Sequence, residues 1–122
     1  LEPGATVLRI RRLRGIGAAE PILEQITLPV TLFPGFRLPV RRRVEDEMYV
    51  LYERDFGVTV ARAEEQLAAV AAGEEEARLL GLNPGAPLLE IARIAYDRAG
   101  RPVERRITML NTAAHRYVAR LE

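Results

Sequence analysis

The chain has 122 residues, enough for one domain with its own core but too few for two. Its formal net charge of +1 excludes a general polyanion binder, and its 48% of hydrophobic residues excludes a disordered chain. No apolar run is long enough to span a membrane, and the absence of cysteine excludes disulfide and thiolate sites and fits a reducing, cytoplasmic compartment.

Two strands are predicted at the start of the chain, on either side of a Gly-Ile-Gly turn: Val7–Arg14 and residues 18–28. Because alternate residues of a strand share a face, Arg12 and Arg14 lie on the same face as their apolar neighbours. On the second strand, Glu24 lies between two isoleucines on one face, where an unpaired carboxylate is costly. We therefore predict that Glu24 meets Arg12 and Arg14 across the hairpin.

This predicted cluster has two interpretations. It is either an internal ion pair that closes one end of the sheet, or a pocket wall that offers donors and an acceptor to a ligand. Structural ion pairs perturb charged groups as functional sites do, and from the residues alone the structural interpretation is favoured.

The middle of the chain predicts two helices. Residues 29–39 form a loop with one short helical turn, and residues 45–56 follow as a helix that ends before Gly57, a residue suited to the end of a helix. Glu74–Leu80 is a second, short helix that ends at Gly81. Its three leading glutamates suit the positive end of the helix dipole.

The segment from Asn83 to Glu104 predicts a turn, a strand, a second turn and a second strand. An Asn-Pro-Gly triplet makes the first turn, since Pro fixes φ and Gly accepts a positive φ. Residues 88–96 and 101–110 are the strands, and Asp-Arg-Ala-Gly closes the hairpin. Hairpins and helices in this order predict an α+β fold with an antiparallel sheet packed by short helices.

The length of the second hairpin loop decides which side chains face each other. With a loop of two or four residues, Arg93 faces Glu104 and Ile91 faces Arg106, whereas a three-residue loop breaks these pairs. Opposite charges across a strand pair contribute only about 0.2–1 kcal/mol. The expected pair of Arg93 and Glu104 therefore suits a structural role and a ligand-binding role equally.

In their order and spacing, these segments resemble the UTRA domain, the effector-binding module of the HutC-type branch of GntR transcription regulators. The resemblance covers nearly the whole chain and implies a chorismate lyase-like α+β fold. It is carried by Tyr49, by Phe56-Gly57-Val58, and by residues 60–65, 75–82, 84–89, 91–97 and 100–104.

Residues 58–72 favour a helix by propensity, because Ala, Glu, Gln and Leu predominate. The resemblance implies instead a long strand that begins at Val58. We follow the resemblance for the first half of this segment, and the second half stays open.

The resemblance also implies site residues. Positions that match Arg12, Arg14 and Glu24 contribute to effector binding in sugar-phosphate-sensing members, which reverses the structural preference stated above. Glu104 matches a carboxylate that often binds effector hydroxyl or amine groups. The full set of predicted ligand-binding residues is Arg12, Arg14, Glu24, Glu47, Tyr49, Arg93 and Glu104.

Two departures from the family pattern bear on the ligand. Glu47 stands where phosphosugar-sensing relatives commonly carry Ser, and a carboxylate there would repel a phosphate. Leu110 stands where they tend to carry Tyr. These departures argue against a phosphorylated sugar and favour a small ligand that carries an amine or several hydroxyls.

An enzyme is not expected. The lone His115 lacks a second His or a Cys at metal-ligand spacing, no glycine-rich phosphate loop is present, and the chain has no Ser nucleophile. We predict neither a cofactor nor a metal. Two alternatives stay open: a chorismate lyase-like enzyme, and a ligand-free dimerisation module whose arginines and glutamates neutralise each other.

The resemblance further implies how the chain works with partners. Residues 1–122 are expected to form one ligand-sensing domain, without the N-terminal winged helix-turn-helix that precedes it in the family. Operator DNA is then reached only through that domain, and the regulator is a homodimer without contact to a membrane. Residues 117–121 are a candidate edge strand for the dimer surface.

Overall fold

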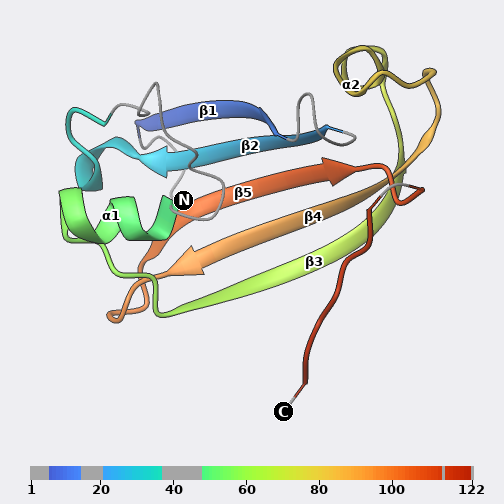
Figure 1. Ribbon diagram of the computed structural model, residues 1–122. Coiled ribbons are helices and arrows are strands. Elements are labelled where there is room, and N and C mark those ends of the chain that lie inside the picture. Colours follow the sequence, from blue (N-terminus) through green and yellow to red (C-terminus); the bar gives the residue numbers. More distant parts are fainter. Residues whose placement is uncertain (1–5, 15–20, 37–47, 114, 122) are drawn as a thin grey trace.

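The computed structural model describes residues 6–14, 21–36, 48–113 and 115–121. Within these residues, five strands form one antiparallel sheet in the order β1-β2-β5-β4-β3 (Figure 1). The α+β class and antiparallel sheet predicted from the sequence are confirmed. The strands are β1 (Val7–Arg14), β2 (Ile22–Pro29), β3 (Arg62–Ala71), β4 (Pro87–Tyr96) and β5 (Pro102–Leu110).

The β1–β2 hairpin has the predicted alternation of faces. Arg12 lies directly opposite Glu24, and Ile10 lies opposite Ile26. All four side chains are buried, so charged and apolar residues share one face of the sheet. The first part of the predicted second strand, residues 18–20, lies outside the described residues.

The predicted register of the β4–β5 hairpin is wrong. The backbone N–H of Asp97 donates to the carbonyl of Arg101 (3.0 Å), which leaves a three-residue loop that ends at Gly100 with φ of 82°. The Asp97 carboxylate accepts the N–H groups of Ala99 and Arg101, and this stabilises the odd-length loop.

A register shift between Ala95 and Tyr96 then sets the pairing along the rest of this hairpin. Arg93 faces Arg106, and Ala95, not Arg93, faces Glu104. The expected pair of Ile91 with Arg106 is replaced by Ile91 with Thr108. The expected Arg93–Glu104 pair therefore does not form.

The long strand expected from Val58 begins later, at Arg62, and continues to Ala71. The N–H of Val58 donates to the carbonyl of Tyr52, so it completes the end of the preceding helix and does not enter the sheet. The second half of the segment, which stayed open, is strand. Ten residue pairs with β4 outweigh its helical propensity.

Three helical elements cover the two faces of the sheet. The 3-10 turn η1 (Val30–Leu32) and α1 (Met48–Phe56) lie within the predicted segments, and α1 ends at Gly57 with φ of 67°. Residues 37–39 of the predicted loop and 45–47 of the predicted helix lie outside the described residues. Helix α2 (Glu74–Leu80) has the predicted bounds, and Gly81 caps it in the left-handed conformation. None of the described helices is long and apolar enough to cross a membrane.

Each face of the sheet has its own apolar core, and α1 and α2 lie at opposite ends of the sheet (Figure 1). The first core packs η1 and α1 against the face that carries Arg12 and Glu24, and the second packs α2 against the other face. The first contains Ile26, Leu28, Phe33, Tyr52 and Val103 among its buried members, and the second contains Leu23, Ala77, Leu80 and Leu88.

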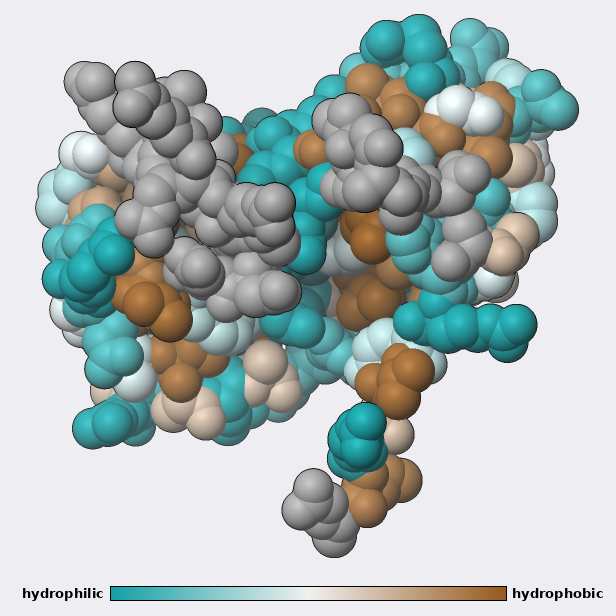
Figure 2. Space-filling model, in the orientation of Figure 1, coloured by the Kyte–Doolittle hydropathy of each residue, from teal (hydrophilic) through white to brown (hydrophobic). Residues whose placement is uncertain are grey.

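Residues 117–121 do not form the predicted edge strand. The C-terminal arm, residues 115–121, has no regular secondary structure and extends away from the sheet (Figure 1). Figure 2 shows it projecting from the body of the domain with apolar side chains in solvent. Tyr117, Val118 and Leu121 are all exposed.

Truncation of Phe33 tests the first core. Phe33 is 1% exposed and packs edge-on against Tyr52 and Phe56. We expect Phe33→Ala to lower the free energy of unfolding by about 3–5 kcal/mol, because it leaves a cavity among aromatic rings. Val30→Ala in the adjacent 3-10 turn is the control and should cost less than about 0.5 kcal/mol. Urea denaturation of the two variants measures the difference, and equal losses would contradict this description of the core.

Candidate functional site

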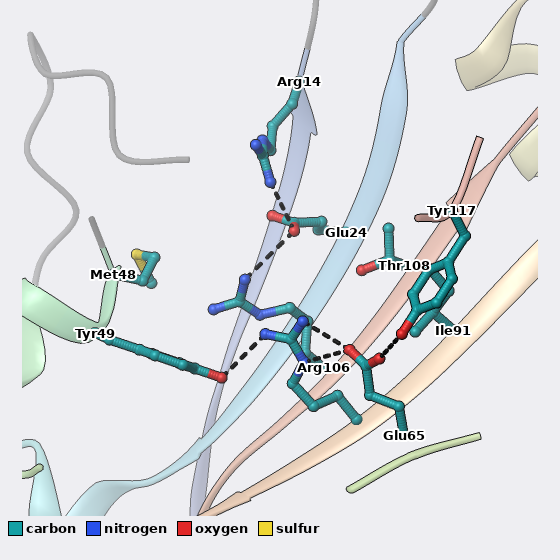
Figure 3. Close-up of a pocket in the computed structure, with 10 residues that line it drawn as sticks. Arg14, Glu24, Met48, Tyr49, Glu65, Ile91, Arg106, Thr108 and Tyr117 are labelled. Atoms are coloured by element: carbon teal, nitrogen blue, oxygen red, sulfur yellow. Dashed lines mark hydrogen bonds and ion pairs between the residues drawn. The ribbon is translucent and has the colours of Figure 1, made fainter. Parts of the chain in front are cut away.

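A cavity of about 380 Å³ opens on the α1 face of the sheet, in the size range of small-molecule sites. It lies between the start of α1 and the C-terminal arm, with β1, β2, β5, β4 and β3 contributing its floor and sides (Figure 3). Its lining is Arg14, Glu24, Met48, Tyr49, Glu65, Ile91, Arg93, Arg106, Thr108 and Tyr117.

Glu24 is the centre of a buried ionic cluster in one wall. Its carboxylate accepts from Arg12 Nε (3.0 Å) and Arg14 Nη1 (2.9 Å), and Arg106 Nη1 lies 3.5 Å from it. Figure 3 shows Glu24 between Arg14 and Arg106. Its side chain is only 3% exposed, so three guanidinium groups offset the cost of burying the charge. The predicted meeting of Glu24 with Arg12 and Arg14 is confirmed.

Glu104 lies beneath the cavity and does not line it. It is fully buried, and its carboxylate accepts hydrogen bonds from Arg106, at 3.2 Å and 2.8 Å, and from the Tyr52 hydroxyl. Burial, together with the nearby Glu104 charge, raises the pKa of Tyr52 far above its ordinary value, so the hydroxyl stays protonated and donates. Glu104 therefore positions Arg106, which does reach the cavity.

The opposite wall is a second set of contacts centred on Arg93. Arg93 donates from Nε to Glu65 Oε2 (2.7 Å) and from Nη1 to the Tyr49 hydroxyl (3.1 Å). The Tyr117 hydroxyl donates to Glu65 Oε1 (2.6 Å). This second set of contacts joins β4, β3, helix α1 and the C-terminal arm at one point.

Proton affinities in this wall follow from its contacts. Burial alone would raise the pKa of Glu65, but hydrogen bonds from Tyr117 and Arg93 outweigh it and hold that pKa below its usual value. Burial, reinforced by the Glu104 charge, raises the pKa of Tyr49. Glu65 is therefore ionised and Tyr49 neutral at neutral pH.

The balance of charge in the described lining is positive. Three lining arginines, Arg14, Arg93 and Arg106, stand against two lining glutamates. Behind the lining, the positive charge of Arg12 and the negative charge of Glu104 cancel. Nη1 of Arg12 is buried without a hydrogen-bond partner among the described residues. Because each carboxylate already accepts from an arginine, the cavity offers more donors than acceptors.

The predicted site residues divide into three groups. Arg14, Glu24, Tyr49 and Arg93 line the cavity, whereas Arg12 and Glu104 contact lining residues from behind. Glu47 lies outside the described residues.

Sequence reasoning missed Arg106, Glu65, Thr108 and Tyr117, all of which line the cavity. The period of two along β5 places Glu104, Arg106 and Thr108 on one face, so Glu104 was a signal for Arg106 and Thr108. Nothing local to Tyr117 indicated its contact with Glu65, 52 residues away.

Metal binding receives no support from the geometry. Among the described residues, no group of three or more His, Asp or Glu side chains is placed to hold a metal ion. The donors in the cavity are guanidinium and phenol groups, which suit an organic ligand with oxygen acceptors.

Comparison with known proteins gives consistent matches. Residues 1–116 match the UTRA domain family. The chain is 32% identical over 99 residues to the HTH-type transcriptional regulator Rv0792c of Mycobacterium tuberculosis, covering 80% of this chain and 37% of that protein. It is 26% identical to MngR, the mannosyl-D-glycerate transport/metabolism system repressor of Escherichia coli, covering 96% of this chain and 48% of that protein. The chain thus spans less than half the length of either relative.

A solved structure supports the fold. The ligand-binding domain of a Bordetella bronchiseptica protein assigned to the GntR family of transcriptional regulators superposes with a TM-score of 0.86 at 38% identity. The match covers 100% of this chain and 77% of that one. The chorismate lyase-like α+β fold expected from the sequence agrees with this similarity.

Neutralising Glu24 tests the buried ionic cluster. We expect Glu24→Gln to lower the free energy of unfolding by about 3–5 kcal/mol, because it leaves the buried Arg12 charge without a counter-ion. Glu75→Gln is a matched control. Glu75 of α2 forms an exposed ion pair with Arg11, which lies on β1 next to Arg12. Thermal or urea unfolding should show that the control has a free energy of unfolding close to that of wild type. A Glu24→Gln variant as stable as the control would contradict the cluster.

Acidification tests the second wall. A glutamate with a lowered pKa stabilises the fold above its unfolded value of 4.5, and this contribution is lost as pH falls through the lowered folded value. We expect the stability difference between wild type and Glu65→Gln to be complete near neutral pH and to shrink below about pH 4.5. Urea denaturation across this range measures it, with Glu64→Gln on the exposed side of β3 as control. A difference independent of pH would refute an ionised, hydrogen-bonded Glu65.

Proposed function

Because the chain belongs to the UTRA domain family, we propose that it is the effector-sensing and dimerisation domain of a HutC-type, GntR-family transcription regulator in the bacterial cytoplasm. The cavity binds a small polar metabolite. Binding alters how a winged helix-turn-helix domain elsewhere in the regulator holds operator DNA. The observation that carries the proposal is an open, donor-rich cavity in a domain similar to the ligand-binding domain of a GntR-family protein.

The surplus of donors sets the kind of ligand. Glu24 already accepts from Arg12 and Arg14, so an amine would have to displace buried arginines to reach it. A ligand that brings carboxylate or hydroxyl oxygens meets Arg93 and Arg106 without that cost. The geometry therefore favours an oxygen-rich metabolite over the amine considered from the sequence.

Regulation follows from where the ligand sits. Arg93 and Glu65 connect two strands to α1 through Tyr49 and to the C-terminal arm through Tyr117. A ligand that takes hydrogen bonds from Arg93 favours one arrangement of these four elements over another. This differential affinity is what couples the cavity to the rest of a regulator.

The two alternative functions make different demands. A ligand-free dimerisation module needs a closed charge network, and the 380 Å³ cavity beside Arg93 and Arg106 argues against one. A chorismate lyase-like enzyme would turn its ligand over. The relatives described above are named as regulators of transcription, which favours sensing over turnover.

Thermal unfolding against a metabolite panel tests the proposed function. The panel holds phosphosugars, polyols, sugar acids including mannosylglycerate, amino sugars, amino acids, imidazole acids and chorismate. A ligand at about a hundred times its dissociation constant should add about 2.7 kcal/mol of stability, which is several degrees for a domain of this size.

Matched variants identify the site. We expect Arg93→Gln to abolish the shift given by a hit, and Arg62→Gln, an exposed arginine on β3, to retain it. No hit across the panel would favour the dimerisation module, and steady conversion of chorismate would establish the enzyme. A hit that is unaffected by Arg93→Gln would place the site elsewhere.

A further inference from the structure

The outer edge of β3 carries a row of backbone groups that no described residue pairs with, because β3 is the last strand of the described sheet. At its end, the N–H of Ala72 donates to the carbonyl of Ala86 on the β4 side (2.8 Å). Hydrogen-bonded pairs alternate along an antiparallel ladder, so even-numbered residues of β3 point their backbone groups toward β4. The odd-numbered residues point theirs outward: Ala63, Glu65, Leu67, Ala69 and Ala71.

This edge lacks the features that usually prevent an edge strand from pairing with another chain. Such strands are usually short, or carry charges, Pro or a bulge. Strand β3 has ten residues paired without a register shift, and all its charged residues lie in the first half. The second half, residues 67–71, has neither charge nor Pro nor Gly, and Leu67 is 47% exposed.

We propose that β3 pairs with β3 of a second copy of this chain, antiparallel, about a two-fold axis at Leu67. The inference rests on the homodimer proposed above and names its surface. In this register Glu65 faces the partner's Ala69 and Ala63 faces the partner's Ala71. The charged half of each strand therefore meets the uncharged half of the other, and the two exposed leucines meet at the axis. A register centred on Glu65 would bring like charges together.

The C-terminal arm supports the same partner. It leaves β5, reaches Glu65 of β3 through Tyr117, and continues beyond the β3 edge (Figure 1). Its exposed Val118 and Leu121 lie past that point. Two-fold pairing keeps the cavity faces of both sheets on the same side, so the arm of each copy lies over the sheet of the other and covers its own apolar residues.

Cysteine cross-linking tests the axis, because the chain contains no cysteine. Opposed residues of a hydrogen-bonded pair have Cα atoms about 5.5 Å apart, within the range of about 4.4–6.8 Å that a disulfide spans. We expect Leu67→Cys to form a covalent dimer rapidly under mild oxidation with diamide, read on a non-reducing gel. Ala63→Cys on the same edge, and Val50→Cys on the exposed face of α1, should cross-link at background rates.

Sedimentation velocity tests separately whether the chain is a dimer and whether β3 forms the dimer interface. We expect wild type to sediment as a dimer, and Leu67→Lys, which places two like charges at the axis, to weaken it by roughly tenfold or more. Val50→Lys removes an apolar residue that is even more exposed, at 58% against 47% for Leu67, and should leave the dimer intact. Circular dichroism confirms that each variant is folded, and none of these measurements needs a ligand.

The outcomes are distinct. A wild-type monomer at high concentration would overturn both the homodimer and this surface. A wild-type dimer in which Leu67→Cys cross-links no faster than Val50→Cys would overturn the β3 surface alone. Rapid cross-linking of Ala63→Cys would overturn the register.

Discussion

The arrangement of charges on the cavity face of the sheet depends on the buried guanidinium of Arg106. This guanidinium lies between two carboxylates, with Glu104 two residues earlier on its own strand and Glu24 on the neighbouring strand. Glu24 in turn holds Arg12 and Arg14 of the next strand. Apart from the partly exposed Arg14, each charge is buried and stable only because its partners are in place. This cluster therefore ties β1, β2 and β5 together and fixes their register, since a slip of one residue would leave every charge unpaired.

The two walls of the cavity consequently differ in how easily a bound ligand could break their contacts. Contacts around Glu24 are buried and costly to disturb, whereas the Arg93–Glu65 pair is partly exposed and contacts the C-terminal arm through the Tyr117 hydroxyl. Tyr49 bridges the walls, because its ring lies 5.6 Å from the Arg106 guanidinium and its hydroxyl accepts from Arg93. A buried wall beside a partly exposed one suits the proposed sensing role better than a purely structural ion cluster.

How far the sequence predicts this arrangement depends on how local each cause is. The β1–β2 hairpin and its meeting of Arg12, Arg14 and Glu24 follow from the alternation of faces, and helix α2 follows from its leading glutamates and Gly81. The β4–β5 register does not, because the Asp97 carboxylate and the positive φ of Gly100 select a three-residue loop that composition leaves open. Strand β3 is formed by pairing with β4 against its own helical propensity. The role of Glu65 could not be predicted for the same reason, since it depends on that pairing.

Glu65 connects the two proposals. Its side chain points into the cavity and binds Arg93 and Tyr117, while its backbone groups point outward along the edge that would pair with a second copy. A ligand that draws Arg93 away changes what holds Glu65 and, through Tyr117, where the C-terminal arm lies. In the proposed dimer that arm crosses onto the partner, so occupancy of one cavity changes contacts at the subunit boundary. Sensing and dimerisation then share one strand, and the coupling needs no movement of the buried cluster around Glu24.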